Sequence, residues 1–334
     1  MSTNISSKKF VLVTGGAGYI GSHASKALKI AGFIPVVYDN LVRGNKWSVK
    51  WGPLEVGDIN NKNQLISVIK KYKIDIVMHF AAYAYVEESI KNPEKYYQNN
   101  ISGTLTLLDA MRECNLNKII FSSTCATYGI PNINPITEEH PQNPISPYGE
   151  SKLIIEKILK NYDKAYGFRS ISLRYFNAAG ADPDGEIGEF HEPETHLIPI
   201  ILESVINKKF NIFINGNDYD TPDGTCVRDY IHVSDLANAH VLALKELILG
   251  ANTQFYNLGN GKGFSVKEVI EASEKATKTK IPYKITNRRA GDPPYLVGNS
   301  NLINIRLGWK PIFSDLEKII FTAWQWHSKN SKSF

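Results

Sequence analysis

The sequence lacks long apolar runs and has few cysteines. No stretch of its 334 residues approaches the roughly 18 consecutive apolar residues of a membrane-spanning helix. Residues 1–9 are polar, without the apolar core of a secretory signal. Cys114, Cys125 and Cys226 lie far apart and show no CxxC spacing, so the cysteines indicate neither a zinc site nor a disulfide framework. We therefore expect a soluble cytoplasmic protein without a membrane partner or a bound metal.

The chain also lacks a strong excess of one charge. Its 38 Lys and Arg residues stand against 33 Asp and Glu residues, which gives a net charge of +5 with the lysines scattered. The short basic spots outside the tail, at residues 207–209 and 288–289, favour a solvated surface over a nucleic-acid interface. Hydrophobic residues make up 43% of the chain, as in ordinary globular proteins. The length suits one large domain or two coupled domains.

The most informative stretch is residues 10–39. An apolar run at 10–13, a glycine turn, a helical segment and a second apolar run ending at Asp39 predict strand, turn, helix and strand. The glycines of the turn recur every third residue, at Gly15, Gly18 and Gly21. This spacing is typical of a dinucleotide site, in which a pyrophosphate lies on the helix N-terminus. A carboxylate at Asp39 would accept hydrogen bonds from a ribose 2′-hydroxyl, which favours NAD, while Arg43 close by leaves NADP open.

Strands and helices continue to alternate up to residue 176. We expect strands at 54–58, 74–80, 118–123 and 168–176, and helices at 62–72, 92–113 and 148–166. This order predicts an α/β fold with a doubly wound parallel sheet, whose ligands bind at the carboxyl ends of the strands. Asp58 follows one strand and either faces the cofactor or caps the next helix. Asn99 and Asn100 either contact a ligand or are polar surface.

The alternation loosens after residue 176. Residues 177–195 and 218–224 are rich in Gly, Asp and Pro, which indicates loops. Between and after them we expect a strand at 210–214 and helices at 199–207, 234–249, 265–277 and 315–327. The C-terminal part is therefore predicted to form a smaller mixed α/β lobe that binds the substrate.

Tyr148 and Lys152 are the strongest candidates for chemistry. They lie four residues apart, on one face at the start of a predicted helix. A lysine ammonium beside a phenol lowers the phenol pKa from its usual value near about 10, which a base acting near neutral pH requires. Thr124 ends the preceding strand and could hydrogen-bond a substrate oxygen. The Tyr-x-x-x-Lys spacing also arises by chance, but not readily together with the glycine turn and Thr124.

Seven motifs together resemble the extended short-chain dehydrogenase/reductase superfamily and, more closely, the UDP-glucose 4-epimerases. The motifs are TGGAGYIGSH (14–23), YDNL (38–41), SST (122–124), SPYGESK (146–152), LRYFN (173–177), GTCVRDYIHV (224–233) and RRAGD (288–292). The resemblance covers about residues 9–327 and implies a Rossmann-type sheet. It also implies a flexible N-terminus at 1–8, an NAD-binding domain at 9–176 and a mainly UDP-sugar-binding lobe at 177–330, some segments of which return to the main sheet.

The resemblance implies the interconversion of UDP-glucose and UDP-galactose with tightly bound NAD. Tyr148 would take the proton from the sugar 4-hydroxyl while hydride leaves C4, and the hydride would return to the other face of the turned 4-keto sugar. Lys152 would lower the phenol pKa and hold the nicotinamide ribose, and Thr124 would orient the 4-oxygen. The implied NAD contacts are Gly15, Gly18, Tyr19, Ile20, Gly21, Asp39, Asn40, Asp58, Ile59, Phe80, Ala81, Ala82, Asn99, Ser122, Tyr148, Lys152 and Tyr175.

For the UDP-sugar, the resemblance implies that Arg228 and Arg289 neutralise the diphosphate, that Asp292 holds the uridine ribose, and that Asn177 contacts a phosphate or the sugar. The alternatives from the residues are surface arginines and, for Asp292 before two prolines, a turn aspartate. Leu296 stands at the family's gatekeeper position beside the sugar, where intermediate size predicts weak acceptance of N-acetylated sugars.

One departure concerns the cofactor. Where many family members have a lysine for the cofactor pyrophosphate, this chain has Tyr83-Ala84-Tyr85, so the contact is absent or replaced.

Several other activities compete with this interpretation. A 4,6-dehydratase or a decarboxylase is disfavoured, because Cys125-Ala126 stands where those relatives carry carboxylates. A 4-epimerase of UDP-pentoses or of UDP-N-acetylhexosamines needs the same groups and remains an alternative. A non-enzymatic NAD sensor would not need Tyr148, Lys152 and Thr124 together. The family also implies a homodimer that pairs the helices at 93–113 and 148–166, although their apolar stripes equally suit the core.

Overall fold

The structure of the chain is a computed structural model that describes residues 9–289 and 291–330. The predicted flexible N-terminus, residues 1–8, lies outside the described residues. The chain divides into two compact units. Unit 1 contains the chain up to Thr127 together with Ser146–Leu173 and Ala237–Phe255. Unit 2 contains Tyr128–Ile145, Arg174–Leu236 and the chain from Tyr256 onward.

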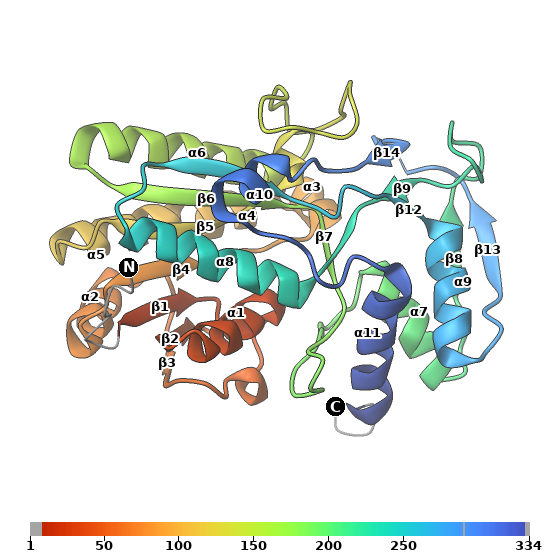
Figure 1. The fold of residues 1–334 in the computed structure, drawn as a ribbon, viewed down its shortest axis with the longest axis horizontal. Coiled ribbons are helices and arrows are strands. Elements are labelled where there is room, and N and C mark those ends of the chain that lie inside the picture. The colour runs from red at the N-terminus through yellow and green to blue at the C-terminus, as the bar shows by residue number, and fades with distance from the viewer. Residues whose placement is uncertain (1–8, 290, 331–334) are drawn as a thin grey trace. The chain divides into compact units, whose positions relative to one another are not determined.

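The main sheet has seven strands in the order β11-β6-β5-β4-β1-β2-β3 (Figure 1). They are β1 Phe10–Thr14, β2 Ile34–Asp39, β3 Leu54–Val56, β4 Ile76–His79, β5 Lys118–Thr124, β6 Arg169–Tyr175 and β11 Gln254–Leu258. Parallel pairings join β3 to β2, β2 to β1, β1 to β4 and β4 to β5. Thr14 is in register with both Tyr38 and His79, so these strands end at one edge. The predicted Rossmann-type α/β class is confirmed.

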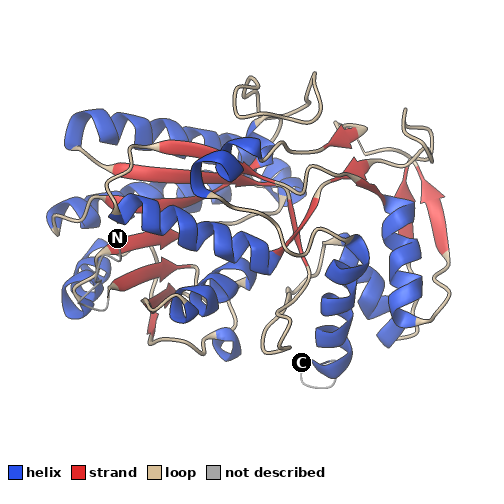
Figure 2. Cartoon of the chain, viewed as in Figure 1, coloured by secondary structure: helices blue, strands red, loops and turns tan. Residues whose placement is uncertain are grey.

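Helices cover both faces of this sheet (Figure 2). They are α1 Tyr19–Ile30, α2 Lys62–Tyr72, α3 Val86–Lys91, α4 Pro93–Tyr96, α5 Gly103–Glu113, α6 Pro147–Tyr166 and α8 Val233–Ile248, with 3-10 turns η1 Lys46–Ser48 and η3 Cys125–Thr127. One buried cluster joins Leu65 of α2, Leu107 of α5 and Ile155 of α6 to the strand residue Leu12. Figure 1 draws α1 and α8 on the near side of the sheet. Burial on both faces explains why these strands read as continuous apolar runs.

The prediction of a single helix over residues 92–113 is wrong for the middle of the segment. Asn92 caps α4 by accepting a hydrogen bond from Lys95 N at 3.3 Å, as its sequence indicates. Residues Tyr97–Ser102 then form a π-helix, η2, before α5 begins. The Thr104 hydroxyl donates to the Asn100 carbonyl oxygen at 2.5 Å, a side-chain bond that competes with the regular helical ladder there. Nothing in the apolar spacing of the segment predicts this widened turn.

Within the described residues, unit 2 is built from strands of two to four residues and from further helices. The strands are β7 Asn177–Ala179, β8 Ile212–Asn215, β9 Val227–Arg228, β10 Tyr230–His232, β12 Phe264–Ser265, β13 Tyr283–Thr286 and β14 Tyr295–Leu296. They pair as β10-β7, β12-β9-β14 and β13-β8. The helices are α7 Leu197–Ile206, α9 Val266–Thr277, α10 Asn301–Leu307 and α11 Leu316–Asn330. The core of this unit joins Ile201, Ile270 and Ile319 from α7, α9 and α11. Strands of two or three residues carry too little periodicity to be predicted.

Membrane insertion through a helix finds no support in the fold. Among residues 9–289 and 291–330, every helix is too short or too polar to cross a bilayer.

Candidate active site

The glycine turn after β1 packs tightly against the next strand end. Gly15 has a φ of +72° and its N–H donates to the Tyr38 carbonyl oxygen at 2.9 Å. A Cβ atom on Gly15 would lie 2.5 Å from the Ala81 nitrogen, which no side chain tolerates. A Cβ on Gly21 would lie 2.3 Å from the Gly15 carbonyl oxygen. Only glycine satisfies both positions, so the spacing in the sequence has a steric cause.

The same turn leaves room and positive potential for a phosphate. Gly18 is the N-cap of α1, where no side chain caps the helix and no acidic residue lies in the first turn. A Cβ on Gly18 would meet only the Gly15 carbonyl oxygen, at 3.3 Å, so the space beyond it is open. Tyr19 and Ile20 form the first turn of this helix. The positive end of a 12-residue helix is therefore available to an anion.

Asp39 lies at the end of β2 beside the glycine turn. Its side chain accepts hydrogen bonds from the backbone nitrogens of Ala17, at 3.0 Å, and Leu41, at 2.9 Å. Burial raises the pKa of this carboxyl, and the two backbone hydrogen bonds oppose the rise. Each carboxylate oxygen keeps capacity for another donor. The Asp39 carboxylate can accept from ribose hydroxyls, and the N-terminus of α1 is open to a phosphate. Together they fit a dinucleotide with an unmodified ribose, as in NAD.

Asp58 and Asn99 meet at one cleft of unit 1. The cleft has a volume of about 600 Å³ and is lined by Asp58, Asn60, Tyr83, Asn92, Glu94, Lys95, Gln98, Asn99 and Ser102. Asn40 donates to Asp58 at 2.9 Å. The alternative that Asp58 caps the following helix is wrong, because Asn61 is the N-cap of α2 and accepts from Gln64 N at 3.1 Å. The structure thus brings three of the predicted cofactor residues together: Asn40, Asp58 and Asn99.

The remaining predicted cofactor residues occupy several places. Phe80, Ala81 and Ala82 directly follow β4, and the Phe80 ring lies 4.8 Å from the His240 ring. Ile59 is buried beneath the start of α5. Ser122 and Tyr175 lie near the ends of β5 and β6.

Thr124, Tyr148 and Lys152 lie together at one corner of unit 1. Helix α6 begins at Pro147 because Ser146 caps it, accepting a hydrogen bond from Gly149 N at 3.2 Å. Tyr148 therefore lies in the first turn, and Thr124 at the end of β5 hydrogen-bonds its phenol. The Lys152 Nζ atom donates to the Ser122 carbonyl oxygen at 2.8 Å and lies 5.9 Å from the centre of the Tyr148 ring. The structure brings together the three residues that the sequence singles out for chemistry.

The pKa values of this corner differ from the simple expectation. Burial raises the pKa of Tyr148 to about 12, although the hydrogen bond from Thr124 lowers it. Burial also lowers the pKa of Lys152 to about 7, although the charge of Glu156 raises it. Burial therefore outweighs the other influences on the phenol pKa in the chain by itself, and the expected role of Lys152 in lowering that pKa stays a prediction. Desolvation, which the sequence does not display, dominates both groups.

Glu156 is a residue of this corner that the sequence interpretation missed. It is 2% exposed and lies one helical turn after Lys152 in α6. Its carboxylate accepts a hydrogen bond from the Ser123 hydroxyl at 2.6 Å. The spacing of four from Lys152 is visible in the sequence, but a glutamate there is equally expected on a solvated helix face.

For Asn100 the alternative of polar surface is wrong, because the residue is 1% exposed. It is buried in the π-helix η2 and accepts a hydrogen bond from Tyr83 N at 2.9 Å. It also donates to the Tyr83 carbonyl oxygen at 3.0 Å and to the Ser151 hydroxyl at 3.1 Å. Asn100 thus fastens the segment after β4 to the helix that carries Tyr148 and Lys152.

Two cations flank the segment that lacks the family lysine. The Lys95 Nζ atom lies 4.1 Å from the centre of the Tyr83 ring, and the Arg43 guanidinium lies 5.1 Å from that of Tyr85. Both cations approach the Glu88 carboxylate, at 2.7 Å and 4.0 Å. Positive charge is therefore present beside this segment despite the substitution.

The predicted substrate residues cluster in unit 2 around Arg228. Its side chain, 11% exposed, donates to the carbonyl oxygens of Val227, at 2.8 Å, and Pro293, at 2.9 Å, and it pairs with the Asp292 carboxylate. Leu296 of β14 is in register with Arg228 of β9. Arg228, predicted to bind the diphosphate, and Asp292, predicted to bind the uridine ribose, thus pair with each other in this structure.

Asn177 and Arg289 join this cluster through the backbone. Asn177 N donates to the Asp229 carbonyl oxygen at 2.9 Å. Arg289 is exposed, and its carbonyl oxygen accepts from Asp292 N at 3.4 Å, so Asp292 also takes part in a turn.

Asp229 is a buried anchor that the sequence interpretation also missed. Its carboxylate accepts three backbone hydrogen bonds, from Asn260 at 2.8 Å, from Gly261 at 3.1 Å and from Gly298 at 3.1 Å. Burial raises its pKa to about 7, against these hydrogen bonds. By tying two loops to the strand end, Asp229 fixes the backbone next to Arg228.

Comparison with known proteins places the chain in a family. Residues 11–259 match the NAD dependent epimerase/dehydratase family. The UDP-glucose 4-epimerase of Lacticaseibacillus casei is 50% identical over 325 residues, which make up 97% of this chain and 98% of the relative.

Two solved structures agree with this. The UDP-glucose 4-epimerase from Brucella ovis in complex with NAD is 49% identical, with a TM-score of 0.94 over 96% of this chain and 98% of that chain. The enzyme from Bifidobacterium longum in complex with NAD+ and UDP is 37% identical, with a TM-score of 0.92 over 98% of this chain and 100% of that chain. The chain belongs to the NAD dependent epimerase/dehydratase family and, within it, to the UDP-glucose 4-epimerases.

Proposed function

We propose that the chain interconverts UDP-glucose and UDP-galactose by transient oxidation at C4 of the sugar. The observation that carries this proposal is the corner of Thr124, Tyr148 and Lys152, on the same sheet as the open glycine turn. Its family membership and its full-length likeness to UDP-glucose 4-epimerases support the same activity. NAD, when bound, accepts the hydride from C4 and returns it.

Tyr148 exchanges the proton of the reaction. Its phenol oxygen takes the proton of the sugar 4-hydroxyl and later gives it back, as base and then as acid. Since the phenol pKa is about 12 in the chain alone, a nearby positive charge must lower it for this transfer to occur near neutral pH. Lys152 is the buried cation that supplies such a charge from within the chain. The Thr124 hydroxyl, already bonded to the phenol, orients the 4-oxygen.

The two parts of the sequence divide the ligands between them. Residues 9–176 mainly hold NAD, through the contacts named in the sequence analysis, and residues 177–330 mainly hold the UDP-sugar. Arg228 and Arg289 bind the diphosphate, because a guanidinium fork suits phosphate oxygens. Asp292 leaves Arg228 to hold the uridine ribose, while Asn177 contacts a phosphate or the sugar. Arg43 or Lys95 supplies the positive charge of the missing lysine.

The assembly and location follow from the family resemblance. We propose a homodimer in the cytoplasm, paired through α5 and α6. The buried residues of these helices already pack in the core of unit 1, so the pairing uses their remaining faces.

The first test incubates purified protein with UDP-glucose and no added NAD, and identifies the product by nuclear magnetic resonance of the sugar. UDP-galactose should form, because the cofactor stays bound and is regenerated in each turnover. Turnover of UDP-xylose or UDP-N-acetylglucosamine without any turnover of UDP-glucose would keep the mechanism and replace the substrate. No product from any of them would contradict an epimerase.

The same assay tests the role of Leu296. We expect a lower kcat/KM on UDP-N-acetylglucosamine than on UDP-glucose, because a side chain of intermediate size restricts the space beside C2. Equal values would contradict this role.

A further inference from the structure

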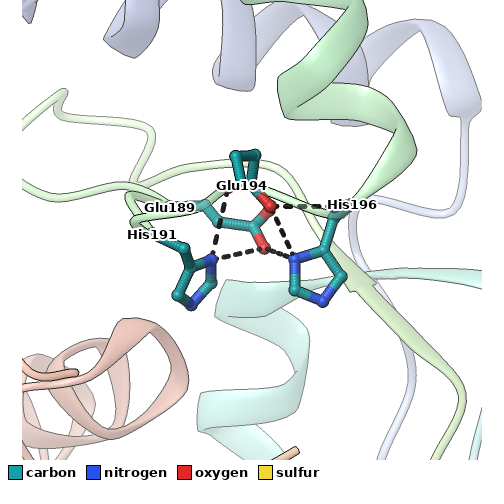
Figure 3. A group of neighbouring side chains, drawn as sticks. All are labelled: Glu189, His191, Glu194 and His196. Atoms are coloured by element: carbon teal, nitrogen blue, oxygen red, sulfur yellow. Dashed lines mark hydrogen bonds and ion pairs between the residues drawn. The ribbon is translucent and has the colours of Figure 1, made fainter. Parts of the chain in front are cut away.

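A second cluster of titratable side chains lies in unit 2, in the loop that leads into α7. Glu189, His191, Glu194 and His196 converge so that one ligand atom of each lies within 4.8 Å of the others (Figure 3). Figure 3 shows the two imidazole rings on either side of the carboxylates, with a nitrogen of each ring turned toward them. Cysteine spacing indicates no metal in this chain, but the cluster has the pattern Glu-x-His-x-x-Glu-x-His, which lies in and directly after a segment predicted as a loop.

The distances between these atoms match the spacing of metal ligands. His191 Nδ1 lies 3.5 Å from Glu189 Oε1 and 3.3 Å from Glu194 Oε2. His196 Nδ1 lies 3.0 Å from Glu189 Oε1 and 2.9 Å from Glu194 Oε1. A tetrahedral zinc ion with bonds of about 2.0–2.1 Å holds neighbouring ligand atoms about 3.3–3.4 Å apart. The four imidazole–carboxylate distances therefore lie close to this spacing, and the four ligand atoms all lie within 4.8 Å of one another.

The imidazole and carboxylate groups of the cluster share their contacts. Each Nδ1 atom carries at most one proton, yet each faces oxygens of both carboxylates. Glu189 Oε1 is shared by both imidazoles. A cation at the centre would take one lone pair from each of the four ligand atoms. A proton on either imidazole instead shares its hydrogen bond between two carboxylates.

The buried carboxylates of the cluster require compensating positive charge. The Glu189 and Glu194 side chains are 6% and 5% exposed, and within the described part of the chain their ion pairs are with His191 and His196 alone. Glu203 of α7 adds a third carboxyl, whose pKa is raised by burial and by the charges of Glu194 and Glu189. Against the effect of burial, the carboxylates of Glu189 and Glu194 raise the pKa of His196 to about 10, so the compensating positive charge comes either from protonated imidazole or, with neutral imidazoles, from one divalent cation.

The surroundings hold the ligands in place and admit an ion. Glu194 Oε1 accepts hydrogen bonds from Thr195 N at 2.7 Å and His196 N at 2.8 Å, which fixes the orientation of the carboxylate. Glu194 and Glu203 also line a cleft of about 580 Å³ in unit 2, which gives an ion a path to the cluster.

We propose that Glu189, His191, Glu194 and His196 bind one divalent transition-metal ion, of which Zn²⁺ has the matching ligand types and geometry. Such a site would brace the loop before α7, and it is independent of the proposed epimerase activity.

The test uses full-length, tag-free protein treated with a chelator and then titrated with ZnCl₂ by calorimetry. We expect one Zn²⁺ per chain and a higher midpoint of thermal unfolding once it is bound. The double variant Glu189→Gln/His191→Asn should weaken binding by roughly tenfold or more, as loss of two ligands requires. The matched control is His140→Asn, since His140 lies in unit 2 outside the cluster and hydrogen-bonds Asn132 N. It should bind Zn²⁺ as the unaltered protein does.

X-ray absorption at the zinc edge provides a measurement that needs no variant. The unaltered protein should show two nitrogen and two oxygen neighbours at about 2.0 Å. No Zn²⁺ retained after gel filtration, equal affinity in the double variant, or a shell without imidazole would overturn the proposal, and would show that the two imidazoles carry the charge as protons. None of these readouts depends on epimerase turnover.

Discussion

Lys152 of unit 1 and Arg228 of unit 2 are both cations with little exposure, but their surroundings differ. Lys152 is 3% exposed and donates to a neutral carbonyl oxygen, and burial lowers its pKa to about 7. Arg228 donates to two carbonyl oxygens and also pairs with the Asp292 carboxylate. Burial opposes the charge of Arg228 too, but neighbouring Cys226 and Asp292 raise its pKa.

This difference teaches which cation can take part in proton chemistry. A guanidinium remains charged at every physiological pH, and an acidic partner secures it further, so Arg228 can bind an anion but cannot respond to a proton. A buried ammonium that donates to a neutral carbonyl oxygen and has one carboxylate nearby titrates near neutrality, so its charge depends on small changes around it. The proposed roles follow: Lys152 adjusts the acidity of Tyr148, and Arg228 anchors a diphosphate.

Removing the phenol hydroxyl should have the largest effect, because neither cation can replace it. We expect Tyr148→Phe to lower kcat by about 10³-fold, within the range for loss of a general acid–base group. The measurement is the rate of UDP-galactose formation at saturating UDP-glucose. The control is Tyr166→Phe at the other end of α6, where the ring is half exposed and the fold should tolerate the change. A Tyr148→Phe variant with more than a tenth of the normal rate would assign the proton transfer to another group.

Removing the titratable cation should have the next largest effect. We expect Lys152→Met to lower kcat by about 10²-fold, because the phenol then stays buried without a neighbouring positive charge. It should also reduce the NAD that copurifies with the protein, measured by chromatography after denaturation. Lys157→Met, at an exposed position of the same helix, is the control and should change neither value. An unchanged kcat with reduced NAD content would restrict Lys152 to cofactor binding.

Changing the permanent cation should affect binding rather than chemistry. Arg228→Lys keeps the charge but loses the fork that reaches two carbonyl oxygens and Asp292. We expect KM for UDP-glucose to rise about tenfold, equivalent to one charge-assisted hydrogen bond, with kcat changed by less than about threefold. Steady-state kinetics would show this, with Arg306→Lys on the exposed face of α10 as control. A fall in kcat without a change in KM would contradict a role in binding the ground state.

The two regions also differ in how much of them the sequence could predict. The glycine turn, Asp39 and the Tyr148–Lys152 pair were readable, since each depends on local spacing within one strand, turn or helix. The parallel α/β class of the sheet follows from the alternation of strands and helices, but the order of its strands does not.

What the sequence could not predict depends on distant contacts. Whether Asp292 pairs with Arg228 depends on folding together residues 64 positions apart. The π-helix at Tyr97–Ser102 and the inward orientation of Asn100 have no apolar signature. The rise of the Tyr148 pKa on burial could not be predicted, because desolvation is a property of the packed chain. The predicted ligand contacts and the boundaries of 9–176 and 177–330 stay predictions.

The smallest and most specific effect is expected for Glu156→Gln. This substitution removes the carboxylate charge that stabilises the Lys152 ammonium, and so it tests the difference between Lys152 and Arg228 directly. The Glu156 charge raises the pKa of Lys152, so Glu156→Gln should lower that pKa further. If the ammonium form of Lys152 is the active one, a lower pKa reduces the fraction of Lys152 in that form by a larger factor at pH 8 than at pH 6. The loss in kcat should therefore grow with pH, to a few-fold at pH 8, and the alkaline limb of the pH profile should move to lower pH. The amide can still accept from the Ser123 hydroxyl, and Glu150→Gln, exposed on the same helix, is the control. A loss that is equal at every pH would mean that Glu156 only supports packing, and Lys152 would then owe its charge to groups other than this carboxylate.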